Sequence, residues 1–351
     1  MSVTIQNKLN PIFETIMLLG IDYEMDRAKE ETVSKLNELG GDGEAIFRKH
    51  LKEFEKYASV FQKNRVITEG EDFYFKEVSL DFYITFTSLF FIREGFIDEI
   101  GQMDNEQLTG IIIENSEELF DKTIPDYSQE HYEDFIKSGS LIALVDGMQL
   151  SESEKWKTFL ILRNPHEYYS RFAGIIKSNI PAYEKAYKAI EISIDKYIGG
   201  FIKARSKDAQ GGLIGLDKEL KGNIISTVIP SMALAAGGLI SFKGYYYGLL
   251  LDKIYAEINK KGNGKEYLIG CLKALSDKSK LEILITLKSC PKYATELAEQ
   301  LGITTATVSH HMSTLLTCEM IYLEKENGKI YYHVNDEAIR NILEQLRSIL
   351  L

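Results

Sequence analysis

Residues 294–316 read ATELAEQLGITTATVSHHMSTLL, and this stretch decides the fold of the C-terminal part of the chain. Apolar residues in its first third recur at steps of three and four, on one face of a predicted helix: Ala294, Leu297, Ala298 and Leu301. Gly302 follows, and glycine readily takes the positive φ angle that ends a helix. Thr304 or Thr305 then caps a second helix, whose buried face is predicted to comprise Val308, Met312, Leu315 and Leu316.

A helical segment precedes this motif and a two-stranded ribbon follows it. Residues 321–334 read IYLEKENGKIYYHV, in which aromatic and aliphatic residues flank a polar tip at residues 325–329. Gly328 gives that tip the flexibility that a hairpin turn requires. Helix, turn, helix and ribbon in this order predict a winged helix-turn-helix, whose second motif helix is shaped to enter the major groove of DNA.

The outward side of the second motif helix and the tip of the ribbon are the predicted DNA contacts. The helix side chains left outward are short, and they carry hydroxyl, imidazole or methyl groups suited to base edges and phosphates. Two lysines at the ribbon tip can reach phosphate or the minor groove. The candidate DNA-binding residues are Thr304, Thr305, Ala306, Thr307, Ser309, His310, Ser313, Lys325 and Lys329.

Three blocks of this region resemble the ArsR-type winged helix-turn-helix repressors, in the same order and spacing. They are Lys273–Asp277 with Leu281–Leu284, Thr307–Met312, and Lys329–Val334. The resemblance implies a homodimer with paired first and last helices, which represses by reading two half-sites of an imperfect inverted repeat. By position, it implies that DNA faces Thr305, Ala306, Thr307, Ser309 and His310.

The better-known members of that family sense metals, but their ligands are absent here. Tyr293 and Thr295 occupy the positions of the family's cysteine pair. In the last helix, Asp336 is followed two places later by Ala338 rather than by histidine. Because thiolate and imidazole hold soft or borderline metals, we predict no metal site and no cofactor.

A polar segment with two glycines, residues 259–265, divides the chain into two periodic parts. We predict a mostly helical domain over residues 1–258, a linker over 259–265, and the winged helix-turn-helix domain over 266–351. Residues 222–248 are rich in Ile, Val, Phe and Tyr around Ala235–Gly238, which predicts a β hairpin in the first domain. The predicted fold class is therefore mainly α, with an α+β C-terminal domain.

The last helix, predicted over residues 336–351, carries more apolar surface than a small domain needs to bury. Its apolar positions are Ile339, Ile342, Leu343, Leu346 and Ile349 or Leu350. This excess suggests a partner chain, in agreement with the homodimer that the resemblance implies.

The net charge of −11 is unevenly distributed along the chain. Residues 265–351 contain 10 basic and 11 acidic side chains, whereas the remainder contains 31 basic and 41 acidic ones. The acidity therefore lies outside the predicted DNA-binding domain. This distribution fits a sequence-specific DNA-binding protein but does not demonstrate one, because phosphate contacts require local cations.

The cysteines and the hydropathy pattern indicate a cytoplasmic protein. Cys271, Cys290 and Cys318 are odd in number and far apart, unlike a disulfide framework. The N-terminus lacks a signal peptide, and the longest apolar stretch, residues 224–240, is interrupted by Ser, Thr, Pro and Gly. The three thiols either form a redox switch or are inert and buried, and burial is the favoured interpretation.

Two aromatic stripes in the first domain each allow two interpretations. Phe82, Phe86 and Phe90, spaced by four, line an apolar ligand pocket or form plain core. The stripe from Tyr183 to Phe201 is a dimer seam or is buried within its own domain. Core burial is favoured for both stripes.

No nucleophile elbow, phosphate loop or His-Glu-x-x-His motif occurs, so we expect no enzyme. The sequence instead predicts a dimeric DNA-binding transcriptional regulator. Its N-terminal domain either binds a small-molecule effector or serves as a protein-interaction or dimerisation module.

Overall fold

The computed structural model describes residues 4–23, 25–38, 43–115, 141–207, 227–241, 244–254, 265–303, 305–326 and 329–351. Two large hydrophobic cores occur in these ranges and share no residue. One is built from residues between Leu9 and Ile254, and the other from residues between Leu268 and Ile342. The predicted linker falls between the two cores, although only Lys265 of it lies within the described residues.

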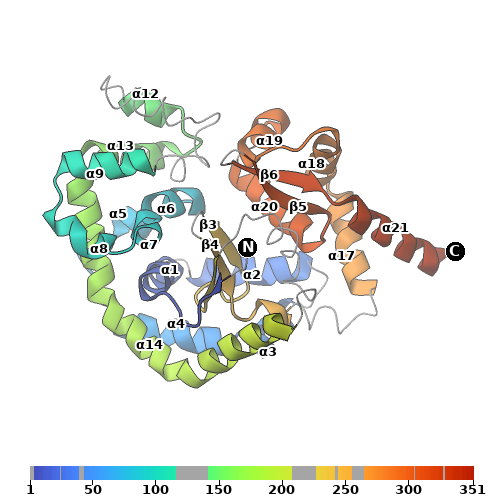
Figure 1. Cartoon of the computed structure of the whole chain (residues 1–351), viewed down its shortest axis with the longest axis horizontal. Helices are drawn as coiled ribbons and strands as arrows, with labels where there is room; N and C mark the ends of the chain where they lie inside the picture. The colour runs from blue at the N-terminus through green and yellow to red at the C-terminus, as the bar shows by residue number, and fades with distance from the viewer. Residues whose placement is uncertain are drawn as a thin grey trace.

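Helices dominate the N-terminal part, and α14 curves around α1 and α4 (Figure 1). Their N-termini follow local sequence signals, such as the capping boxes that Asp104 forms with Gln107 and Ser151 with Glu154. The helices are α1 (Pro11–Tyr23), α2 (Met25–Glu38), α3 (Gly43–His50), α4 (Lys52–Asn64), α5 (Asp72–Phe75), α6 (Leu80–Thr87), α7 (Leu89–Ile92), α8 (Phe96–Glu99), the 3-10 helix η1 (Ile100–Gln102), α9 (Asn105–Glu114), α12 (Leu141–Asp146), α13 (Glu152–Arg163) and α14 (Pro165–Lys207).

A four-stranded sheet completes this part, in the order β1-β2-β4-β3. Its strands are β1 (Thr4–Ile5), β2 (Thr227–Ser231), β3 (Gly238–Ser241) and β4 (Gly244–Gly248). The predicted hairpin was wrong in its turn and its partners, because β2 pairs in parallel with β1 and β4 instead of folding back at Ala235–Gly238. The antiparallel pair is β3 with β4. Parallel pairing requires a crossover rather than a tight turn, so no local signal reveals it.

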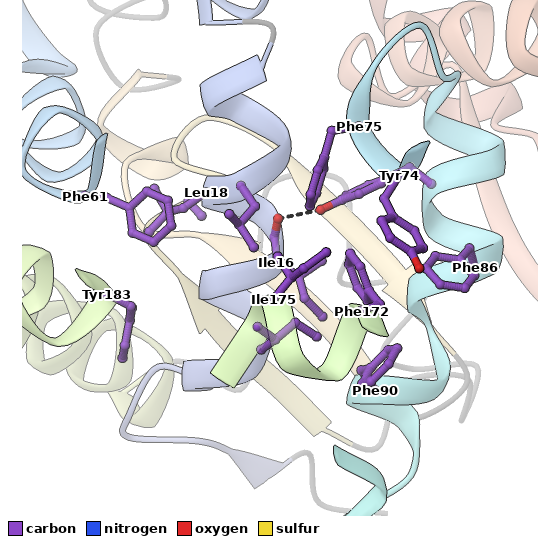
Figure 2. Packing of buried hydrophobic residues seen from close by; sticks show 14 of the residues in the cluster. Ile16, Leu18, Phe61, Tyr74, Phe75, Phe86, Phe90, Phe172, Ile175 and Tyr183 are labelled. Atoms are coloured by element: carbon purple, nitrogen blue, oxygen red, sulfur yellow. Dashed lines mark hydrogen bonds between the residues drawn. The ribbon is translucent and has the colours of Figure 1, made fainter. Parts of the chain in front are cut away.

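The two aromatic stripes are buried in the N-terminal core. Phe86 and Phe90 pack against Phe172 of α14, with ring centroids 5.1 and 5.3 Å apart (Figure 2). A cavity beside Phe82 and Phe86 holds about 20 Å³, far less than the roughly 300 Å³ of a small ligand pocket. The stripe on α14 is buried at Ile190, Ile194 and Phe201, and α14 contacts α1 and α4. Both stripes therefore form core, as favoured from the sequence.

Glu14 is a buried carboxylate that ties α1 to the end of β2 and to α4. Its Oε1 accepts hydrogen bonds from Ser231 Oγ at 2.6 Å and Met232 N at 3.2 Å. Its Oε2 accepts from Tyr57 Oη at 2.8 Å and Ala233 N at 2.9 Å. Burial raises the pKa of Glu14 to about 7, against the opposite effect of these four donors. The Glu14 side chain thus holds α1, α4 and the end of β2 together.

Glu14→Gln replaces one oxygen by an NH₂ group that faces two donors, so two hydrogen bonds are lost. We expect the free energy of unfolding to fall by about 1–3 kcal/mol in urea titrations. Because burial raises the pKa of Glu14 to about 7 from 4.5, the stability it contributes is fully present below 4.5 and lost as pH rises through 7. The loss should therefore be larger near about pH 5 than near about pH 8. The exposed control Glu30→Gln should leave the free energy of unfolding unchanged at both pH values. Equal unfolding curves for the two variants would contradict this role.

The C-terminal part consists of α17 (Lys265–Ser276), α18 (Lys278–Ser289), α19 (Ala294–Leu301), α20 (Thr305–Thr317), β5 (Ile321–Glu326), β6 (Lys329–Val334) and α21 (Asp336–Leu350). Strands β5 and β6 pair antiparallel. The predicted winged helix-turn-helix is therefore confirmed. Helix α17 contacts both α21 and α2, so it joins this part to the N-terminal one. Among the described residues, no helix has the length and apolar character needed to span a membrane.

Candidate DNA-binding surface

The turn between α19 and α20 is fixed by Gly302. Its φ angle is 65°, the left-handed conformation predicted from the sequence. The backbone N–H of Ile303 donates to Ala298 O at 3.0 Å, and that of Gly302 donates to Glu299 O at 3.2 Å. These two bonds form a Schellman motif, which satisfies the last carbonyls of α19 and sets the direction in which α20 departs.

One face of α20 is held in the C-terminal core. Val308, Met312 and Leu315 are buried, as predicted, and α20 contacts α18, α19 and β5. By the 3.6-residue period, positions 306, 310 and 313 fall on the opposite face, and Ser313 is exposed there. Burial of one face therefore determines which face of α20 is presented outward.

Among the predicted contact residues, the structure describes the side chains of only two, Thr307 and Ser313. Thr307 is half-buried and Ser313 is exposed. Thr304 lies outside the described residues. For the remaining candidates the structure describes the backbone in α20, β5 and β6 but not the side chains: Thr305, Ala306, Ser309, His310, Lys325 and Lys329.

The wing is anchored at its base by residues that the sequence analysis missed. Tyr332 N donates to Lys292 O at 2.8 Å, which adds the segment before α19 to the edge of β6. Asn335 N donates to Met320 O at 2.8 Å, and Asn335 Nδ2 donates to Glu319 O at 2.8 Å. Lys325 and Lys329, at the far end of the ribbon near its tip, are thus carried by a fixed base.

His311 packs toward the N-terminus of α18. It is half-buried, and the pKa of Asp277 is lowered chiefly by a hydrogen bond from Lys280 N, with a contribution from His311. Adjacent positions of a helix diverge by about 100°, so position 310 does not share the face of His311. This arrangement agrees with the prediction that one histidine of the pair packs on the domain.

The positions of the family's cysteine pair are part of the core. Tyr293 and Thr295 are buried, and the Tyr293 ring meets Tyr331 edge-on at 5.6 Å. Glu296 accepts a hydrogen bond from Tyr293 N at 3.1 Å, which caps α19. Within the described ranges, no group of three or more His, Cys, Asp or Glu side chains is arranged to hold a metal. The absence of a metal site stays a prediction.

A helix packed on one face, preceded by a fixed turn and followed by an anchored ribbon, defines a winged helix-turn-helix DNA-binding protein. The family model described as "Bacterial regulatory protein, arsR family" matches residues 277–322, from the cap of α18 into β5.

Two arsenical resistance repressors agree with this match. The arsenical resistance operon repressor of Staphylococcus aureus is 36% identical over 78 residues, which are 22% of this chain and 75% of the relative. The repressor of the same name from Bacillus subtilis (strain 168) is 30% identical over 99 residues, 27% of this chain and 86% of the relative. The crystal structure of NolR from Sinorhizobium fredii is 25% identical and covers 26% of this chain and 91% of that one, with a TM-score of 0.22.

The chain belongs to the arsR family, and it is a DNA-binding transcriptional regulator rather than an enzyme. The resemblance seen in the sequence is confirmed. The family model begins at Asp277, so it covers no residue of the N-terminal domain.

Gly302→Ala should destabilise the C-terminal domain by about 1 kcal/mol, because an L side chain disfavours the left-handed conformation. No atom lies within 4 Å of the Cβ position, so the effect is purely conformational. Gly302→Asn should cost less, because asparagine tolerates this conformation. Gly174→Ala, in open space on α14, is the control and should be neutral or stabilising. Urea unfolding measures all three variants, and equal stability of Gly302→Ala and wild type would contradict the assigned turn.

Proposed function

We propose that this chain is a cytoplasmic repressor that binds an inverted-repeat operator as a homodimer, with one α20 in each half-site. The observation that carries the homodimer is the apolar surface of α21, on which Leu343 is 54%, Ile349 53% and Leu350 69% exposed. Exposed apolar side chains gathered on one element mark interaction surfaces.

The geometry of α21 supports this assignment. Its Ile342 is buried, and Ile339 and Leu346 pack partly against the C-terminal core. The end of the helix extends past the rest of the domain (Figure 1), so its last apolar residues have no such support. Helix α17 lies against α21 and exposes Ile269. A two-fold axis through these helices would bury the exposed residues on both protomers and set the spacing of the two α20 helices.

For DNA contacts, we propose Thr304, Thr305, Ala306, Thr307, Ser309, His310 and Ser313 on or before α20, and Lys325 and Lys329 on the wing. The supporting observations are the buried opposite face of α20 and the anchored base of the ribbon. Helix α20 contains no lysine or arginine, so cationic contacts to phosphate must come from the wing and neighbouring segments.

The N-terminal domain has two proposed roles. In the first, it binds a small apolar or aromatic effector that favours one conformation over another. In the second, it is a dimerisation or protein-interaction module. The filled aromatic core around Phe86 and Phe172 supports the second role, since the cavity there is too small for an effector. A melting shift of the full chain with a metabolite would support the first role.

The test of the repressor proposal is selection of binding sites from genomic and randomised DNA by the full-length protein, at two salt concentrations. Enrichment of an inverted repeat is the expected result, because a two-fold dimer reads a two-fold site. Failure of the folded dimer to enrich any repeat would overturn the proposal. The selected operator then serves for the affinity measurements below.

The double variant Leu343→Glu, Leu350→Glu should convert the dimer to a monomer. Each leucine buried at an interface contributes about 1.5–3 kcal/mol, so we expect dimerisation to weaken at least about 100-fold. Light scattering after size-exclusion chromatography measures the mass, and the operator affinity should fall in parallel. Ile192→Glu on α14, which is 86% exposed, is the matched control and should leave the mass unchanged. A double variant that stays dimeric would place the interface elsewhere.

Ser309→Ala and Lys329→Ala should weaken DNA binding in different ways. If Ser309 reads a base edge, its loss costs about 1–3 kcal/mol on the operator and relaxes base preference at one position. Loss of Lys329, a phosphate contact, should weaken all sequences equally and reduce the salt slope by about one. Lys188→Ala on α14 is an exposed control with no expected effect. Equal, sequence-independent losses for Ser309 and Lys329 would contradict the role of Ser309.

A further inference from the structure

Two buried thiols belong to the same core, next to the end of α20. Cys271 lies on α17, and Cys318 directly follows α20; both belong to the C-terminal core. Tyr267, one helical turn before Cys271, donates a hydrogen bond from its Oη to Cys318 O at 2.9 Å. Residues four apart on a helix share a face, so the same face of α17 that reaches Cys318 also carries Cys271.

The two thiols share the C-terminal core and perturb each other's pKa in opposite directions, so they are not equivalent. The neighbouring Cys318 thiol is the main cause that holds the pKa of the Cys271 thiol below its usual range. The pKa of Cys318 is raised, chiefly because its proton is held in the bond to Cys271 and because it is buried. Cys271 is thus the better nucleophile, and Cys318 is the neighbouring thiol that can resolve an oxidised Cys271.

We propose that Cys271 and Cys318 form a disulfide on exposure to a hydroperoxide, and that this bond lowers the affinity of the regulator for DNA. The second half of this inference rests on the proposed function, whereas the first half does not. The disulfide requires the two sulfurs to approach to about 2.05 Å.

The chemistry needs only the two thiols and the peroxide. The Cys271 thiolate attacks a peroxide oxygen, the O–O bond breaks, and the leaving oxygen takes a proton to become water or an alcohol. The Cys271 sulfenic acid is then attacked by the sulfur of Cys318, which gives up its proton. The S–O bond breaks and water leaves. Two thiols are oxidised by two electrons in total, and one peroxide is reduced.

A groove provides an approach for the oxidant. It has a volume of about 450 Å³ and is lined by Tyr267 of α17, Glu319 and Ile342 of α21. Tyr267 is bonded to the backbone carbonyl of Cys318, and Glu319 adjoins Cys318 in the chain. A hydroperoxide in this groove therefore reaches the residues beside both cysteines, and a local opening at Tyr267 would admit it to the buried thiols.

A disulfide at this place would act on the recognition helix. Cys318 N donates to Thr314 O at 3.0 Å and closes the last turn of α20, and Met320 N donates to Leu315 O at 3.0 Å. Between them, Glu319 has a φ angle of 55°, so the backbone is already in the left-handed region. Drawing Cys318 toward α17 shifts the end of α20 relative to the proposed dimer helix. The spacing of the two α20 helices changes with it.

The first measurement is a peptide map of the full-length protein. Reduced protein is treated with hydrogen peroxide, remaining thiols are alkylated, and tryptic peptides are analysed by mass spectrometry. We expect one intrachain peptide pair that joins Cys271 to Cys318. Cys290→Ala, which removes the exposed thiol, should leave this product intact. Cys271→Ala and Cys318→Ala should each abolish it, with the fold of each variant checked by its melting curve. Two unoxidised thiols, or linkage through Cys290 alone, would overturn the proposal.

The second measurement is affinity for the selected operator by fluorescence anisotropy. Oxidation should lower the affinity about 5- to 150-fold, the usual range of coupling between two sites, and dithiothreitol should restore it. Cys271→Ala should show no change on oxidation. A disulfide that forms without changing affinity would overturn the coupling to DNA. Reduced protein that binds no DNA would instead overturn the proposed function, while the peptide map still decides whether the disulfide forms.

Discussion

The attachment of α20 at both of its ends is the constraint on which the DNA-binding part depends. At the start, the left-handed Gly302 and its Schellman bonds fix the direction of the chain. At the end, Cys318 closes the last turn, and Asn335 ties the segment before β5 to the start of α21. Between these points the buried face, centred on Val308, Met312 and Leu315, fixes the rotation of the helix. A small movement at either end therefore changes what the outward face presents.

Helix α17 lies where several of these constraints meet. It contacts α2 of the N-terminal part and α21 of its own domain, and its Tyr267 bonds to Cys318 at the end of α20. Helix α2 also contacts α1, and the buried Glu14 of α1 is bonded to Ser231 at the end of β2. A conformational change in the N-terminal domain that moves α2 would therefore also move α17. Such coupling requires that α17 has two arrangements, and that the N-terminal domain and the DNA-binding surface each favour one of them.

The sequence predicted those features that local chemistry determines. The helical stripes, the left-handed Gly302 and the ribbon after α20 each follow from residues within a few positions of one another. The parallel sheet did not, because β1 at Thr4 pairs with β2 at Thr227, and no nearby turn reports a pairing over that separation. The candidate contact positions on α20 follow from the sequence pattern and stay a prediction, whereas the placement of Cys271 and Cys318 in one core required the tertiary structure.

The composition of α20 explains why the proposed function needs two copies of the chain. The helix has hydroxyl, methyl and imidazole groups but no lysine, arginine, aspartate or glutamate. Such a surface can discriminate bases, yet it gains little from the phosphate contacts that supply most of the affinity for DNA. The C-terminal part as a whole has 10 basic and 11 acidic side chains, so it offers no general attraction either. Pairing through α21 would make the second half-site contact intramolecular and raise its effective concentration. In the proposed dimer, the exposed leucines of α21 would compensate for the uncharged helix α20, because dimerisation would supply the affinity that charge does not.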